Sequence, residues 1–326
     1  MAFALARALA NEQGVDAPPP TALDHISRVL KLKMNAVETS VSTPDGRVLH
    51  VEEAGDPTGK PVVILHGTPS AGHIYERHAA DAAERGIRLI GYDRPGYGGS
   101  TPQPGRSVAA CTADVRAIAA ALDIDRLAVW GISGGGPHAL ACAALLPELV
   151  VAVGSLASIA PYGSPGLDYF GGMGQENVDD TKLTLEDEPA AREKLVRDRE
   201  RLLAMTAADM ANAMPTLMSP VDVAARTPDL ARHLFTNMHY GLAPGGEGWW
   251  DDGIAHLQAW GFNVEEIRVP VQLWHGRHDQ FVPFQHGEWL ASRIPGVDSH
   301  LTSVDGHLTL MQQRIPELHA WLLEHF

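Results

Sequence analysis

The feature that most constrains the fold is a serine set among glycines, between an apolar run and an alanine-rich run. Residues 127–138 are Leu-Ala-Val-Trp-Gly-Ile-Ser-Gly-Gly-Gly-Pro-His. A Gly-x-Ser-x-Gly sequence in this context is typical of a tight strand-to-helix turn that leaves the serine hydroxyl exposed at its tip. The neighbouring positions must be small because the turn is strained. We therefore expect Ser133 to be a nucleophile, with the N–H of Gly134 directed at the carbonyl it attacks.

The same glycines allow a second interpretation. Residues 134–139, Gly-Gly-Gly-Pro-His-Ala, fit the looser Gly-x-Gly-x-x-Ala dinucleotide fingerprint. That fingerprint requires an acid about 20 residues further on, at the end of the next strand. The next expected strand, 150–158, ends without an acid. A dinucleotide site also usually lies on the first strand of its domain, whereas this turn follows about the fifth. The sequence therefore favours the serine turn.

Apolar runs alternate with helical patterns along most of the chain. Strands are expected at 61–65, 87–92, 127–132, 150–158, 269–274 and 300–304, after a hairpin of 37–42 and 48–53. Helices are expected at 75–85, 108–122, 137–146 and 283–294, with one closing helix to Phe326. This alternation predicts an α/β fold with a doubly wound, mostly parallel sheet, whose ligands bind beyond the carboxyl ends of the strands.

The alternation stops between residues 161 and 248. A glycine-rich stretch leads into a charged helix near 186–205 and further helical pieces broken by prolines. We expect a helical cap at 161–248, a core of 37–160 and 249–326, and an N-terminal extension, 1–36, of unknown role. Packing is the simpler role for any one apolar residue of the cap, but several are candidates for an acyl pocket. They are Met205, Met210, Met214, Met218, Phe235, Met238 and Tyr240.

A serine is a poor nucleophile at neutral pH unless an imidazole accepts its proton and an acid orients that imidazole. Asp279 follows the expected strand that ends at Trp274, and His307 follows Gly306 in a loop before the closing helix. Each would lie at the carboxyl end of a strand, as Ser133 does. We expect Ser133 to be the nucleophile, His307 the general base and Asp279 the orienting acid.

Other titratable residues compete less well for these roles. His275 and His278 flank the expected acid and are better suited to orient its loop. His138 and His256 lie on expected helices, where packed or polar roles are the default. Asp305 is close to His307 in sequence but could equally end the strand before it.

A second loop supplies a backbone donor. His66-Gly67-Thr68-Pro69 directly follows the first buried strand. The N–H of Thr68 could join that of Gly134 in an oxyanion hole, a pair of donors for the negative oxygen that forms during acyl transfer. Loss of one such donor typically costs about 2.7 to 4 kcal/mol of barrier.

Composition excludes several classes of protein. Forty acidic residues against 25 Lys and Arg give a net charge of -15, which disfavours binding to nucleic acid and to anionic membranes. No apolar run reaches the roughly 18 residues needed to span a membrane, and the first residues lack the basic segment of a signal peptide. We therefore expect a cytoplasmic protein.

The two cysteines, Cys111 and Cys142, are expected to be buried, and no spacing predicts a metal or cofactor. The oligomeric state stays open.

Five motifs together resemble the α/β-hydrolase superfamily over residues 37–326. They are 66–69 (His-Gly-Thr-Pro), 91–100 (Gly-Tyr-Asp-Arg-Pro-Gly-Tyr-Gly-Gly-Ser), the serine turn, His275-Gly276-x-x-Asp279, and Gly306-His307. The resemblance is narrower to capped serine hydrolases such as bacterial esterases and proline iminopeptidases. It implies Ser133, Asp279 and His307 as the catalytic triad, Thr68 and Gly134 as oxyanion donors, and 161–248 as the cap. It gives Asp93 and Arg94 a structural loop role only.

The resemblance also narrows the activity. Epoxide hydrolases and dehalogenases of this superfamily carry Asp at the turn, so Ser133 argues against them. The turn Gly-Ile-Ser-Gly-Gly departs from the Gly-x-Ser-Trp-Gly usual in iminopeptidases. We expect hydrolysis of a small carboxylic ester through an acyl-serine intermediate, without a cofactor. The alternatives are an iminopeptidase-like aminopeptidase, a carbon–carbon bond hydrolase, a cofactor-free perhydrolase, and a non-catalytic ligand sensor.

Overall fold

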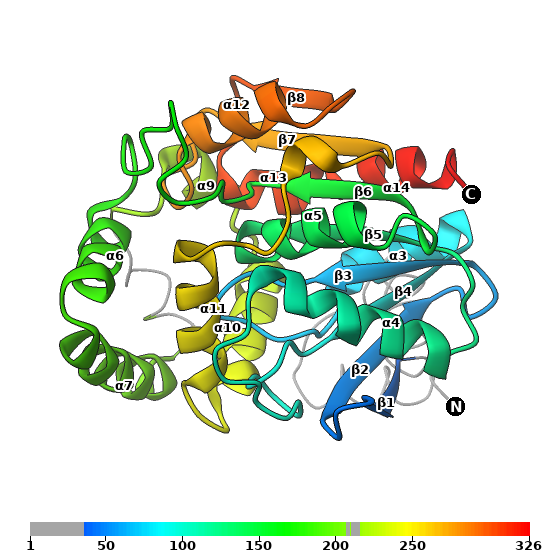
Figure 1. Cartoon of the computed structure of the whole chain (residues 1–326), viewed down its shortest axis with the longest axis horizontal. Helices are drawn as coiled ribbons and strands as arrows, with labels where there is room; N and C mark the ends of the chain where they lie inside the picture. Colours follow the sequence, from blue (N-terminus) through cyan, green and yellow to red (C-terminus); the bar gives the residue numbers. More distant parts are fainter. Residues whose placement is uncertain (1–35, 207–208, 210–215) are drawn as a thin grey trace, which may run out of the picture.

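A computed structural model describes residues 36–206, 209 and 216–326 of the chain. Within these residues an eight-stranded sheet, in the order β1-β2-β4-β3-β5-β6-β7-β8, crosses the molecule (Figure 1). Its strands are β1 (Val37–Ser42), β2 (Val48–Gly55), β3 (Lys60–Leu65), β4 (Ile87–Tyr92), β5 (Leu127–Ile132), β6 (Val150–Leu156), β7 (Val271–Gly276) and β8 (Asp298–Thr302). Strands β3 to β8 are parallel, and β1 and β2 form the antiparallel edge. The predicted doubly wound, mostly parallel sheet is confirmed.

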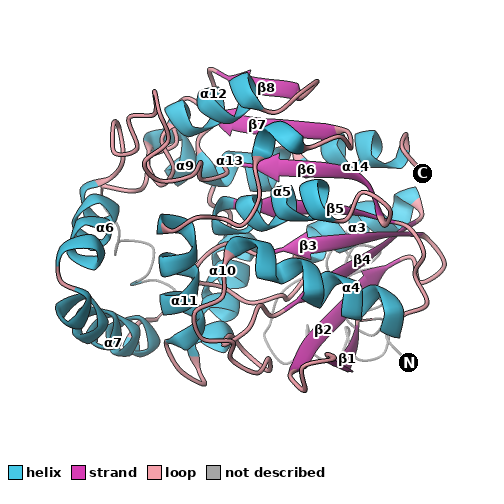
Figure 2. Cartoon of the chain, in the orientation of Figure 1, coloured by secondary structure: helices cyan, strands magenta, loops and turns pink. Residues whose placement is uncertain are grey.

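Helices cover both faces of the sheet (Figure 2). Val63 and Leu65 of β3 enter one buried cluster, and Val62 and Ile64 enter another on the opposite face. The first cluster includes side chains of α4 (Cys111–Ala121), α5 (Gly136–Leu145) and α12 (Phe284–Arg293). The second includes side chains of α3 (Glu76–Arg85), α13 (His307–Gln313) and α14 (Ile315–Leu323).

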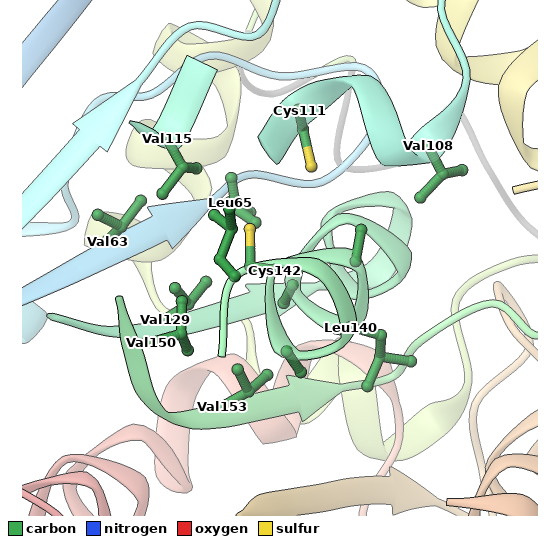
Figure 3. Close-up of a cluster of buried hydrophobic side chains, with 14 of the residues drawn as sticks. Val63, Leu65, Val108, Cys111, Val115, Val129, Leu140, Cys142, Val150 and Val153 are labelled. Carbon is green, nitrogen blue, oxygen red and sulfur yellow. The ribbon is translucent and has the colours of Figure 1, made fainter. Parts of the chain in front are cut away.

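The cluster on the α4–α5 side contains both cysteines (Figure 3). Cys111 and Cys142 are buried free thiols among valines and leucines, as expected from their alanine-rich surroundings. Burial of apolar area of this kind contributes about 25 cal/mol per Å², so these contacts are a main source of stability. The core fixes α5 against β5 and β6, and therefore fixes the turn that joins β5 to α5.

Several predicted boundaries need correction. The expected helix 108–122 is a 3₁₀ turn, Val108–Ala110, followed by α4. Strand β6 ends at Leu156, not at 158. Strand β7 begins at Val271 and not at 269, because Pro270 has no N–H to donate to a neighbouring strand. Strand β8 runs from Asp298 to Thr302, where 300–304 was expected.

The closing helix is in fact two helices. Helix α13 ends before Arg314, and α14 begins at Ile315 with a proline in its first turn. A proline cannot continue the hydrogen bonds of a preceding helix, so Pro316 starts a new one. His307 is consequently the first residue of α13 and does not lie in a loop.

Residues between β6 and β7 form a helical insertion, as predicted. It contains α6 (Gln175–Glu186), α7 (Glu188–Ala204), α9 (Pro220–Ala225), α10 (Pro228–Leu242) and α11 (Glu247–Leu257). Helices α6 and α7 lie away from the sheet, with α10 and α11 between them and it (Figure 1). Helix α11 crosses the expected boundary at 248, so the division into cap and core stays a prediction. The expected extension, 1–36, lies outside the described residues except for Ala36.

Most charged residues of α7, the charged helix of the insertion, pair with one another within one turn. Arg192 pairs with Glu188, and Lys194 pairs with Asp198. Pairs of this i,i+4 kind contribute about 0.3 to 0.5 kcal/mol each, and pairing within the helix accounts for most of its charge pattern. Among the described helices, none has both the length and the apolar character that crossing a membrane requires.

Candidate active site

The serine turn has the geometry that its sequence predicted. Strand β5 ends at Ile132, and Ser133 adopts a φ of 56°, a left-handed conformation rare for a residue with a side chain. A side chain at Gly131 would collide with the carbonyl of Gly135. A side chain at Gly135 would collide with the carbonyl of Leu65. The glycines are therefore required by contacts between backbones.

Asp279 and His307 form a buried pair. Asp279 Oδ2 lies 2.7 Å from His307 Nδ1, and its Oδ1 accepts the N–H groups of Phe281 and Val282, both at 2.9 Å. The ring of Phe281 lies 4.7 Å from that of His307. Burial lowers the pKa of His307, but the charge and hydrogen bond of Asp279, together with the charge of Asp222, outweigh it. The pKa of His307 is therefore raised.

Ser133 and His307 line the same cavity. Its volume is about 800 Å³, and its wall includes the carboxyl ends of β3 and β5 and side chains of α6, α7, α10 and α11. Within the described part of the chain, Ser133 Oγ makes no hydrogen bond to His307. Such bonds are often long in ligand-free sites and tighten when substrate binds. The predicted nucleophile and base thus lie on one cavity, with the predicted acid buried behind the base.

The predicted oxyanion loop lies beside the serine turn. A side-chain carbon placed on Gly67 would lie 3.5 Å from Ser133 Cβ, and one on Gly134 would strike the side chain of Thr68. Among the described residues, the backbone N–H of Thr68 has no hydrogen-bond partner. A free N–H in a loop beside the serine turn is the kind of donor that an oxyanion hole requires.

A buried ion cluster holds the Thr68 side chain. Thr68 Oγ1 donates to Asp252 Oδ2 at 2.8 Å and accepts from Arg94 at 2.9 Å. Arg94 and Arg106 both donate to Asp252, at 2.5 and 2.7 Å, and the Tyr97 hydroxyl donates at 3.0 Å. Burial raises the pKa of Asp252, but the two arginines dominate and hold it well below its usual range. Sequence analysis did not single out Asp252, which lies on α11 without a recognisable motif.

Two histidines fix the carbonyl of Gly134. His138 Nδ1 and His256 Nε2 donate to it at 2.9 and 3.0 Å. Burial is the main cause that lowers the pKa of both imidazoles, that of His256 to about 4. Both are therefore neutral donors at pH 7 that hold the residue after Ser133 in place.

The other candidates for the catalytic acid and base do not contact Ser133 or His307 through side-chain hydrogen bonds among the described residues. His275 Nε2 donates to the carbonyl of Val282 and so braces the loop of Asp279. His278 is exposed. Asp305 pairs with Arg314.

The predicted acyl-pocket residues divide into two groups. Met218 and Met238 line the cavity. Three others do not: Met205 packs against a separate apolar cluster, Phe235 lies on His239, and Tyr240 lies on His73. Their apolar character is explained by packing of the insertion. Met210 and Met214 lie outside the described residues.

Metal ligands do not gather in the described part of the chain: no group of three or more His, Cys, Asp or Glu there could hold an ion.

Comparison with known proteins places the chain in a family. The model of the alpha/beta hydrolase fold matches residues 60–313, so the chain belongs to that family. The AB hydrolase superfamily protein YisY of Bacillus subtilis is 26% identical over 265 residues, which are 78% of this chain and 86% of that protein. A proline iminopeptidase of Xanthomonas citri is 37% identical over 109 residues, 32% of this chain and 34% of that one.

Solved structures show the same fold. An esterase from Thermogutta terrifontis superimposes with a TM-score of 0.65 and 20% identity, over 89% of this chain and all of that one. An esterase from Exiguobacterium antarcticum gives a TM-score of 0.64 at 21% identity, over 88% of this chain and 100% of that one. At this identity the similarity defines the architecture and leaves the substrate open.

Proposed function

We propose that the protein is a serine hydrolase that cleaves small carboxylic esters through an acyl-serine intermediate. One observation carries the proposal: Ser133, held in a left-handed turn, opens on the same cavity as His307, whose ring is bonded to Asp279. The esterases among the structural neighbours are consistent with it.

The mechanism follows from these positions. His307 Nε2 accepts the Ser133 hydroxyl proton as Oγ bonds to the ester carbonyl carbon, and the N–H groups of Thr68 and Gly134 stabilise the oxygen that becomes negative. The bond from this carbon to the alcohol oxygen then breaks, and the imidazolium gives its proton to the departing alcohol. Water next attacks the acyl group, passes a proton to His307 and releases the acid, and Ser133 recovers its proton.

The cavity favours a mainly apolar acyl group. Its lining includes Trp130, Ile159, Met218, Leu234, Met238 and Phe281. We propose that residues 161–248 act as the cap, because α6, α7 and α10 contribute to this wall. The cytoplasmic location stays a prediction.

The first experiment is turnover of p-nitrophenyl esters from acetate to laurate by the wild type and Ser133→Ala. We expect turnover in the wild type and its loss in the variant, while Ser292→Ala, an exposed serine on α12, stays at the wild-type rate. A fluorophosphonate should add one adduct per protein, mapped by mass spectrometry to residue 133. Ester turnover that survives Ser133→Ala would refute the proposal. A single product equivalent per protein would indicate a ligand sensor.

A second candidate is an aminopeptidase similar to proline iminopeptidases. The observation in its favour is Glu176 Oε2, which is buried on the cavity wall without a hydrogen-bond partner in the described residues. A carboxylate in this position could bind the amino group of a substrate. Proline p-nitroanilide distinguishes the two: turnover that depends on a free amine and falls in Glu176→Gln would favour the aminopeptidase.

A further inference from the structure

Asp222 joins the insertion to the start of α13. It lies on α9, its side chain is fully buried, and it is 85 residues from His307 in sequence. Its Oδ2 accepts the backbone N–H of His307 at 3.0 Å, and its Oδ1 accepts those of Leu308 and Thr309 at 2.7 and 3.2 Å. Three of the four N–H groups that a helix leaves unpaired at its start are thus bound by one carboxylate from another element.

The surroundings of this contact are built to hold it. Ser219 caps α9 and donates its hydroxyl to Asp222 Oδ2 at 2.8 Å. A side chain at Gly306 would collide with the Asp222 carboxylate, so the residue before His307 must be glycine for the contact to form. In this chain, the glycine of the Gly306-His307 motif is therefore required by the contact with Asp222 of the insertion.

The contact also places a charge beside the general base. The charged and titratable groups facing His307 are Asp279 from the loop after β7, Asp222 from α9 and His275 from β7. Arg226, just after α9, lines the same cavity. Burial lowers the pKa of His307, and the charges of Asp279 and Asp222 both act to raise it. Asp222 thus acts on the imidazole without touching it.

We propose that Asp222 is a positioning residue for His307, which makes the place of the general base depend on the docking of the insertion onto the core. This inference rests on the proposed serine-hydrolase function. Its distinguishing property is a double effect. The backbone contacts set where α13 begins and therefore where the imidazole lies, and the charge sets the pH at which the imidazole loses its proton.

The test is Asp222→Asn in the full-length protein, with two independent measurements. The asparagine keeps an acceptor but removes the charge and brings an amide N–H towards the helix start. We expect the acid limb of kcat/KM against pH to move to lower pH by about one unit. We expect kcat to fall by up to about 100-fold, as for a misplaced catalytic group, with a much smaller change in KM. Titration of the His307 ring by NMR, assigned with His307→Gln, should show the same pKa decrease without any substrate.

Asp229→Asn is the matched control. Asp229 also anchors the insertion to the core, because it accepts hydrogen bonds from Tyr75 and Arg77, and within the described residues none of its side-chain hydrogen bonds goes to α13. It should leave the acid limb and the His307 titration at their wild-type pH, even where stability decreases. If Asp222→Asn does not fold, Asp222→Glu keeps the charge and changes its reach. That variant should lower kcat while the acid limb stays at the wild-type pH.

The outcomes separate the two proposals. A variant Asp222→Asn that loses thermal stability but keeps the wild-type His307 pKa and kcat would overturn the positioning role, as would an unchanged kcat in Asp222→Glu. The pKa of His307 could instead fall in Asp222→Asn while the wild-type protein, with Ser133 intact, hydrolyses no ester. That result would uphold the effect of Asp222 on the imidazole and refute the proposed function.

Discussion

At the scale of single residues, Asp279 uses both of its carboxylate oxygens. One is bound by two backbone N–H groups and the other by His307. In Asp279→Asn the amide can present an N–H to His307 Nδ1, which favours the tautomer whose Nε2 carries the proton. That imidazole cannot accept a proton from Ser133, so we expect kcat for p-nitrophenyl acetate to fall by about 10³ to 10⁴.

Asp305→Asn is the control for this prediction, since Asp305 lies two residues from His307 and competes with Asp279 in the sequence. Its carboxylate pairs with Arg314, 9 residues away along the chain, and not with the imidazole. We expect a modest loss of stability with nearly unchanged kcat. Near-normal activity in Asp279→Asn combined with a large loss in Asp305→Asn would exchange their roles.

The candidate residues that the sequence predicts are those recognised from residues adjacent to them in the chain. Ser133 is recognisable because the turn needs glycines on both sides of it, and His307 and Asp279 each follow a strand at its carboxyl end. Asp222 and Asp252 have no such local mark. Each is an ordinary aspartate on a helix, and its importance arises from partners at least 85 residues away. A single sequence does not contain that pairing.

At the scale of elements, pairing with distant residues also explains a strand boundary that was predicted wrongly. Strand β8 begins at Asp298, a residue type that is uncommon in strands, because it pairs in register with Gln272 of β7 and accepts its side-chain amide at 2.9 Å. Strands β4 and β5 are buried on both faces and read clearly as apolar runs, so their predicted bounds were correct. The bounds of these two strands were predictable from their own residues, whereas the start of β8 depends on its pairing with β7.

Helix α11 is held to the core by its buried aspartate. In Asp252→Asn, Arg94 and Arg106 keep their positive charges in a buried site that no longer holds this carboxylate. Removal of one partner of a buried ion pair typically costs about 3 to 5 kcal/mol. We expect the free energy of unfolding, measured in urea, to fall by about that amount.

Asp251→Asn, at the neighbouring position, is the control. It tests whether the loss of stability in Asp252→Asn comes from the buried ion cluster or from the removal of any acid on α11. Asp251 pairs with Arg106 at 3.2 Å and accepts the N–H of Gly105 at the same distance. It contacts only one of the two arginines, so the loss of stability should be clearly smaller. Equal losses in the two variants would mean that the cluster around Asp252 has no special energetic role.

At the scale of the whole molecule, many histidines are buried in the neutral form. Burial is the main cause that lowers the pKa of His66 and His78 to about 3 and of His286 to about 4. Two of these tautomers are fixed by hydrogen bonds, because a ring nitrogen of His66 accepts the N–H of Arg94 and one of His286 accepts that of Ala160. A second proton on either ring would remove that acceptor.

These lowered pKa values predict early loss of stability in acid. Unfolded histidines bind protons near pH 6.5, whereas these rings bind them only near pH 3 to 4 when folded. The unfolded state therefore binds more protons throughout that window, and stability decreases as pH falls below about 6.5, by up to about 1.4 kcal/mol per pH unit for each ring. The raised pKa of His50, His73 and His307 acts in the opposite sense but concerns fewer groups.

His286→Gln separates this effect from the titration of carboxylates. Glutamine can donate to the carbonyl of Tyr169, which His286 Nε2 contacts at 2.9 Å, but it binds no proton in acid. We expect the slope of unfolding free energy between pH 6.5 and 4.5 to decrease by up to about 1.4 kcal/mol per pH unit. His278→Gln is the matched control, because it replaces an exposed imidazole and leaves every buried ring in place. A midpoint temperature of thermal unfolding that stays constant from pH 7 to 5 would contradict the conclusion that these histidines are neutral when buried. Neutral buried histidines cannot be protonated without weakening the fold.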